Sequence, residues 1–180
     1  VIKPLLRKYF YSNIVKKSSS LKKDLNLLII GGSQGAKLFD TVLKKSVTEL
    51  AKEYKIKVYH QTQMTNLKDL KNFYVINNID NHIFSYDENI LPIISKANLC
   101  ITRAGASTLS ELVFLNIPFL TIPLLSSKDD HQYENAAFYK NLGCCWILKQ
   151  NNLDDNQIKN SLVNIIENEE DYLMKKNKMY

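Results

Sequence analysis

Short apolar segments that alternate with longer amphipathic ones constrain the fold of this chain most. Six runs, most of them rich in Ile, Val or Leu, have the length of buried strands and lie at 25–30, 56–59, 73–76, 99–102, 119–122 and 144–148. Between them, helical patterns occupy about 36–53, 64–71, 88–96, 107–115, 131–141 and 154–168. Such alternation is typical of βαβ units. It predicts a doubly wound α/β domain, in which a mostly parallel, Rossmann-like sheet carries helices on both faces.

Length and composition favour a single compact domain. The chain has 180 residues, of which 45% are hydrophobic and 23% charged, and this excludes a disordered protein. We expect a linker at 1–24, the folded domain at 25–170 and a truncated tail at 171–180. Because the sequence begins with Val1 rather than Met, we expect it to be a fragment of a longer protein.

The charge and the cysteines narrow the class of protein. The net charge of +6 comes from scattered lysines, which predict either a solvated basic face or mild attraction to phosphates or an acidic membrane. No basic stripe with interleaved aromatic residues argues for nucleic acid. The odd cysteine count, Cys100, Cys144 and Cys145, favours buried, reduced thiols over a disulfide framework or zinc site. Reduced thiols are typical of a cytosolic protein, which is what we expect. No run reaches the length needed to span a bilayer, and no signal peptide is visible.

In a doubly wound sheet, ligands bind beyond the carboxyl ends of the strands. The first segment at such a position is GGSQGA, residues 31–36, between a predicted strand and a predicted helix. Its glycines allow the backbone to approach a ligand, and the N–H groups of the next helix favour an anion. The segment matches neither the dinucleotide fingerprint nor the Walker A loop. An ordinary strand-to-helix turn is the alternative.

The second segment, RAGAST at 103–108, follows the predicted strand LCIT. Gly105 and its small neighbours would let a diphosphate approach a helix N-terminus, where Ser107 or Thr108 could donate a hydrogen bond. Glu111, three residues after Thr108, could accept both hydroxyls of a ribose. A capping box, Thr108-x-x-Glu111, is the alternative, in which both side chains only satisfy N–H groups of the helix.

The third segment, DDHQYEN at 129–135, follows FLTIPLL. It could be a metal cluster, a catalytic His/Asp pair, a set of sugar-binding residues or a polar helix start. Metal ligation is disfavoured because no second His or Cys has suitable spacing. His131, Gln132 and Asn135 can reach past a helix start together. Amides suit sugar hydroxyls, since each amide supplies a donor and an acceptor.

In this order, GGSQGA, RAGASTLSEL and IPLLSSKDDHQYENA closely resemble the C-terminal half of the MurG family of peptidoglycan glycosyltransferases. The resemblance covers about residues 4–170. It implies the C-terminal half of a GT-B glycosyltransferase, which binds UDP-GlcNAc without a metal or cofactor. The whole enzyme of the family transfers GlcNAc from this donor to lipid I and forms lipid II.

The resemblance also implies roles for residues. The phosphates would meet the backbone and hydroxyl groups of Gly105, Ala106, Ser107 and Thr108. Glu111 would hold the ribose, and the segment around Tyr86 would meet the uracil edge through its backbone. The GlcNAc hydroxyls would be read by His131, Gln132 and Asn135. At the interdomain cleft, the resemblance places Ser33 and Gln34 near the diphosphate and sugar, and it matches Arg7 to an arginine after the interdomain linker.

The family's N-terminal domain has no counterpart in this sequence. That domain carries the acceptor site, the proposed general base and most of the membrane-docking surface, so we expect no turnover by this half alone. The resemblance implies a peripheral location on the inner face of the cell membrane. Two alternatives stay open: a UDP-sugar-binding module or decayed fragment without turnover, and another GT-B enzyme such as a UDP-GlcNAc epimerase-like protein.

Overall fold

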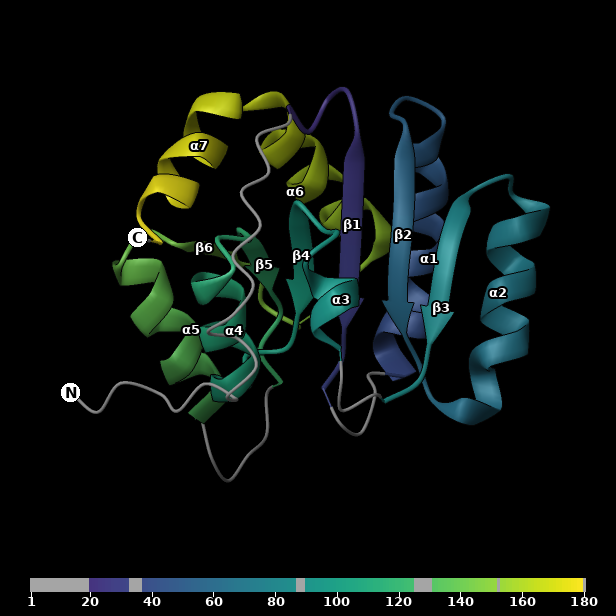
Figure 1. The fold of residues 1–180 in the computed structure, drawn as a ribbon, viewed down its shortest axis with the longest axis horizontal. Helices are drawn as coiled ribbons and strands as arrows, with labels where there is room; N and C mark the ends of the chain where they lie inside the picture. The colour runs from purple at the N-terminus through teal and green to yellow at the C-terminus, as the bar shows by residue number, and fades with distance from the viewer. Residues whose placement is uncertain (1–19, 33–36, 87–89, 125–130, 152, 180) are drawn as a thin grey trace.

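The computed structural model describes residues 20–32, 37–86, 90–124, 131–151 and 153–179. They form one six-stranded sheet with helices on both faces (Figure 1). The strand order is β3-β2-β1-β4-β5-β6, and every neighbouring pair is parallel. The strands are β1 (Leu25–Ile30), β2 (Ile56–Gln61), β3 (Asp80–Phe84), β4 (Leu99–Thr102), β5 (Phe119–Thr121) and β6 (Cys145–Ile147). This is the strand order of Rossmann-type sheets, and it confirms the predicted fold class.

The helices cross over between parallel strands and form two layers. They are α1 (Lys37–Ala51), the 3₁₀ turn η2 (Met64–Asn66), α2 (Leu67–Ile76), α3 (Leu91–Ile94), α4 (Ala106–Phe114), α5 (His131–Asn141), α6 (Asp155–Glu167) and α7 (Glu169–Asn177). Figure 1 shows α1 behind the sheet and α3 in front of it. One hydrophobic cluster joins the sheet to α1, α2 and α6, and a second joins it to α3, α4 and α5.

Helix α1 shows how the sequence selects its buried face. Phe39, Leu43, Val47 and Leu50 recur at helical spacing and are all buried against the sheet. Burial of each such side chain contributes about 1.5–3 kcal/mol. The apolar stripe therefore fixes how α1 lies on the sheet after it leaves the glycine-rich turn.

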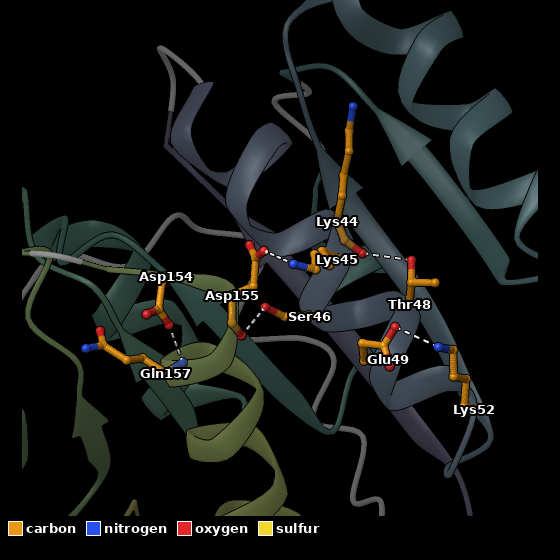
Figure 2. Close-up of polar contacts among 9 residues, drawn as sticks. All are labelled: Lys44, Lys45, Ser46, Thr48, Glu49, Lys52, Asp154, Asp155 and Gln157. Carbon is orange, nitrogen blue, oxygen red and sulfur yellow. Dashed lines mark hydrogen bonds and ion pairs between the residues drawn. The ribbon is translucent and has the colours of Figure 1, made fainter.

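Helix α6 packs beside α1, and Figure 2 shows the polar contacts around this junction. Ser46 Oγ donates to the backbone oxygen of Asp155 at 2.7 Å, and Lys45 Nζ lies 3.1 Å from the Asp155 carboxylate. Asp154 caps α6, since its side chain accepts a hydrogen bond from the backbone N–H of Gln157 at 2.8 Å. These contacts fix the start of α6 against α1.

The predicted strand at 73–76 is wrong. These residues form the last turn of α2, where Leu70 and Tyr74, one turn apart, face the core. Val75 and Ile76 are 57% and 79% exposed, so the apolar run is no buried strand. The strand lies further on, at β3, whose polar sequence DNHIF suits the edge of the sheet. Asn78, with φ of 55°, makes the turn between the two elements.

The C-terminal segment is helical. Residues 169–177 form α7, and Tyr172 is buried in the core, where its hydroxyl donates to the backbone oxygen of Asn98 at 2.9 Å. The boundary between domain and tail stays a prediction. All three cysteines are buried and free, as predicted. Among the described helices, none is long and apolar enough to cross a membrane.

Candidate functional site

A cleft opens at the carboxyl ends of β1 to β4, where the strand order reverses and α/β sheets place their ligands. Its volume is about 1450 Å³. This exceeds the ~300–1,000 Å³ of most small-molecule sites. The walls include Gly31, Gly32, Gln61, Thr62, Ser85, Tyr86, Arg103, Gly105, Ala106, Ser107, Thr108, Glu111 and Gln132.

The turn after β1 forms one wall of this cleft. Gly32 has φ of +85°, in the left-handed region that residues with a side chain rarely adopt. The next described residue, Lys37, begins α1 and also lines the cleft. The predicted site residues Ser33 and Gln34 lie outside the described residues, as does Arg7. The glycine pair thus brings the backbone to the edge of the cleft.

The turn from β4 into α4 forms the facing wall. Gly105 is the N-cap of α4, and no side chain of the described residues caps the helix. The N–H groups of the first turn, which includes Ala106, Ser107 and Thr108, therefore lack partners within the helix. A Cβ placed at Gly105 would find Thr108 Oγ1, at 4.0 Å, as its nearest neighbour. Open space and unpaired N–H groups together make this turn suitable for an anion.

The capping-box alternative for Thr108 and Glu111 is wrong. Thr108 is the third residue of α4 rather than its N-cap, and Glu111 lies in the second turn. Glu111 is only 4% exposed and lines the cleft. A buried carboxylate at a cleft wall is suited to accept hydrogen bonds from hydroxyl groups. Tyr86, two residues after β3, also lines the cleft and is 53% exposed.

Helix α5 brings its amides toward the same turn. Asn135 Nδ2 donates to the backbone oxygen of Ala104 at 3.0 Å and so holds the residue before Gly105. Gln132 lines the cleft, and its Oε1 accepts a hydrogen bond from the backbone N–H of Leu124 at 2.9 Å. His131 does not line the cleft; its side chain is 77% exposed, with Nδ1 3.8 Å from the carboxylate of Glu134. Among the described residues of α5, the structure thus places Gln132 in the cleft wall, whereas Asn135 supports the turn before Gly105 from behind and His131 stays outside the lining.

Sequence reasoning missed Arg103, which lines the cleft directly after β4. Its Nη1 donates to the backbone oxygen of Ile122 at 2.9 Å and to Gln150 Oε1 at 2.6 Å. The guanidinium also stacks on Phe39, with Cζ 4.9 Å from the ring centre. Burial lowers the pKa of Arg103, but an arginine stays charged. The sequence did contain a signal for Arg103, because this residue opens RAGAST immediately after a predicted strand, where ligand-binding residues are expected.

A buried polar network behind the cleft was also missed. Asp40 Oδ2 accepts hydrogen bonds from Thr62 Oγ1 at 2.7 Å and from Asn66 Nδ2 at 2.9 Å. Asp40 Oδ1 lies 3.4 Å from His60 Nε2, and His60 Nδ1 lies 3.0 Å from the hydroxyl of Tyr74. These contacts tie α1 to the loop after β2. Because Thr62 lines the cleft, the network fixes part of the cleft wall.

The protonation states of this network follow from its burial. Burial alone would raise the pKa of Asp40, but the nearby ring of His60 and the hydrogen bonds from Thr62 and Asn66 outweigh it and lower the pKa. Burial lowers the pKa of His60, although Asp40 opposes this. The network therefore holds an ionised Asp40 beside a neutral His60 at neutral pH. Among the described residues, no group of three or more His, Cys, Asp or Glu side chains could hold a metal ion.

Comparison with known families decides the class of protein. The model of the glycosyltransferase family 28 C-terminal domain matches residues 26–179. The chain belongs to this family. The match confirms the predicted resemblance to the C-terminal half of MurG-type transferases and agrees with the parallel sheet described above.

Individual members of the family 28 glycosyltransferases agree with this assignment. The chain is 49% identical over 180 residues to the UDP-N-acetylglucosamine--N-acetylmuramyl-(pentapeptide) pyrophosphoryl-undecaprenol N-acetylglucosamine transferase of Pelagibacter ubique (strain HTCC1062). This match covers 99% of the present chain and 50% of the Pelagibacter protein. The chain is 33% identical over 159 residues to the enzyme of the same name from Rickettsia bellii (strain RML369-C), with coverage of 87% and 45%. The chain therefore spans about half the length of these relatives.

Solved structures show the same arrangement. The crystal structure of Acinetobacter baumannii MurG superposes with a TM-score of 0.74 at 26% identity, over 87% of this chain and 44% of that one. UDP-GlcNAc 2-epimerase from Neisseria meningitidis, solved with UDP-GlcNAc bound, gives a TM-score of 0.58 at 17% identity, over 86% and 39%. At that identity the epimerase shares the fold alone.

Proposed function

We propose that this chain is the donor-binding half of a MurG-type inverting glycosyltransferase and that it binds UDP-GlcNAc. One observation carries the proposal. The glycine turn after β1, the turn into α4 with Glu111, and Gln132 of α5 come from distant parts of the sequence and line one cleft. They belong to the three segments that resemble the MurG family, whose relatives are named for this GlcNAc transfer.

In this proposal, the diphosphate lies at the start of α4. The unpaired N–H groups of the first turn and the hydroxyls of Ser107 and Thr108 donate to its oxygens, and the open face of Gly105 permits close approach. Such an N-terminus contributes about 0.3–1 kcal/mol for each charged group near the surface, and up to about 2 kcal/mol where the site is partly buried. The chain can thus stabilise a diphosphate through its backbone.

The remaining contacts follow from position in the cleft. Glu111, buried one turn further along α4, accepts the ribose hydroxyls. The backbone around Tyr86, two residues after β3, meets the uracil edge. Gln132 and Asn135 face the GlcNAc hydroxyls after exchanging their present bonds to backbone groups. His131, which is exposed at the start of α5, adds a donor at the outer edge of the sugar site.

In the whole enzyme, the reaction would be an inverting displacement at C1 of GlcNAc. The hydroxyl of lipid I forms the new bond to C1, the bond from C1 to the β-phosphate oxygen breaks, and UDP leaves with the electron pair. The start of α4 lowers the barrier because it stabilises charge that develops on the diphosphate. The acceptor lipid, the base that takes its proton and the contact with the inner membrane face belong to an N-terminal half.

Calorimetric titration of the purified chain with UDP-GlcNAc, beside UDP-glucose, tests this proposal. We expect saturable binding that prefers UDP-GlcNAc. Glu111→Gln removes the charged acceptor and should weaken binding roughly 10- to 150-fold, which corresponds to about 1.5–3 kcal/mol for a hydrogen bond to a charged group. Glu170→Gln, exposed on α7, is the matched control. A folded chain that binds neither nucleotide sugar contradicts the proposal.

A further inference from the structure

Gln61 carries a polar atom that the fold itself does not use. It is the last residue of β2, pairs with Phe84 of β3 and lines the cleft. Only 3% of the residue is exposed, and its Oε1 is buried without a hydrogen-bond partner among the described residues. Buried polar atoms in native proteins are nearly always paired, so a buried, unpaired acceptor at the wall of a cleft indicates a partner that arrives with a ligand.

The structure around Gln61 fixes the direction of its side chain. Alternate residues of a strand face opposite sides of the sheet. His60, the residue before, contacts Asp40 and Tyr74 on the side of α1 and α2. Gln61 therefore faces the other side, toward α3, where Tyr59 packs in the second hydrophobic cluster.

The network behind the cleft holds this position in place. The residue after Gln61, Thr62, is fixed through its hydroxyl to Asp40 and through its backbone N–H to the oxygen of Phe84 at 2.9 Å. The backbone of Gln61 is thus held between two anchored neighbours. A fixed backbone reduces the entropy that is lost when a ligand binds to the side chain it carries.

The neighbours of Gln61 indicate which part of a ligand it meets. Ile30, Ile90 and Ile94 line the cleft on the same side of the sheet, and Tyr86 follows two residues after β3. An apolar wall with one buried amide oxygen suits a flat heterocycle and its ribose, which combine apolar faces with N–H and O–H donors. The diphosphate needs donors instead, and these lie at the start of α4.

We propose that Gln61 is a donor-binding residue whose Oε1 accepts a hydrogen bond from the nucleoside of the nucleotide sugar, either the imide N–H of uracil or a ribose hydroxyl. This inference rests on the proposed function, since it concerns the same cleft. It assigns to the carboxyl end of β2 a part in recognition that none of the three sequence segments contains. It also explains why the fold tolerates a buried acceptor that has no hydrogen-bond partner in the described part of the chain.

Gln61→Met tests the inference, because methionine keeps the length of the side chain and removes both polar atoms. We expect the variant to bind UDP and UDP-GlcNAc about 2- to 10-fold more weakly, by the same factor for both ligands, as for loss of one neutral hydrogen bond. The melting temperature of the free chain should not fall, since Oε1 has no hydrogen-bond partner among the described residues to lose. Gln157→Met, on the exposed face of α6, is the control and should change neither quantity.

Further ligands separate the two sources of the bond. If the imide is the donor, N3-methyl-UDP should bind wild type and Gln61→Met equally; if a ribose hydroxyl is the donor, 2′-deoxy-UDP or 3′-deoxy-UDP should do so. Unchanged affinity of Gln61→Met, a lower melting temperature with unchanged affinity, or a loss seen with UDP-GlcNAc but not with UDP would each overturn the inference. If wild type binds no uridine nucleotide, the proposed function itself fails and this inference falls with it.

Discussion

The hydrogen bond from Thr62 to Asp40 gives a quantitative test of how the cleft wall is held. Thr62→Val replaces the hydroxyl by a methyl group of similar size at a position that is 2% exposed. The lost bond is short, 2.7 Å, and its acceptor is a carboxylate with a lowered pKa. Hydrogen bonds to charged groups contribute about 1.5–3 kcal/mol. At about 2–4 °C per kcal/mol for a domain of this size, the melting temperature should fall by about 3–12 °C.

Urea unfolding of wild type, Thr62→Val, Asp40→Asn and the double variant measures the coupling between the two side chains. Thr41→Val is the matched control, because Thr41 lies exposed on α1 and, within the described structure, its hydroxyl bonds only to backbone oxygens of its own helix. We expect a coupling free energy of about 1 kcal/mol or more for the pair. If Thr62→Val destabilises the chain no more than Thr41→Val, or if its effect is additive with that of Asp40→Asn, the account of the network is refuted.

Three further predictions concern other buried groups. Burial lowers the pKa of His60, so neutral His60 stabilises the fold fully above about pH 6.5, and this stabilisation is lost as pH falls below that value, by at most about 1.4 kcal/mol per pH unit. The urea midpoints of His60→Gln at pH 7.5 and 5.5 should therefore differ less than those of wild type. Equal differences for the two proteins would contradict this prediction. Tyr172→Phe removes the bond to Asn98 and should lower the free energy of unfolding by about 1 kcal/mol in urea titrations, whereas no loss would show that the bond adds nothing. Burial raises the pKa of all three thiols, those of Cys100, Cys144 and Cys145. We therefore expect a thiol reagent at pH 8 to label the chain only after addition of urea. Rapid labelling of the native chain would contradict the packing around these cysteines.

Hydrophobic pattern predicted most of the fold because buried strands leave a strong signal. The central strands β1 and β4 are buried along nearly their whole length and read as continuous apolar runs. The prediction of the third strand was wrong because β3 is an edge strand of sequence DNHIF, in which two of the five residues are exposed. The apolar run NFYVI beside it belongs to α2, and only tertiary packing shows that Tyr74 faces the core while Ile76 faces solvent.

The sequence predicted those parts of the candidate site that residue types within a short segment are enough to indicate. Glycines and small residues after strands indicated the turns at Gly32 and Gly105, which now line one cleft. The rule that ligands lie beyond strand ends applied equally to Gln61 and Arg103, but their role depends on burial and on partners far away in the sequence. No sequence pattern shows that an amide oxygen is buried without a partner. Long-range contacts of this kind need the structure.

An NMR titration tests the central claim, a UDP-GlcNAc site at the carboxyl ends of the strands, most directly. Backbone amide signals of the ¹⁵N-labelled chain would be followed as UDP-GlcNAc is added. We expect saturable shifts at Gly32, Gly105, Ala106 and Ser107, with the signals of α7 unchanged. Saturable shifts confined to α6 and α7, or no shifts in a folded chain, would contradict it.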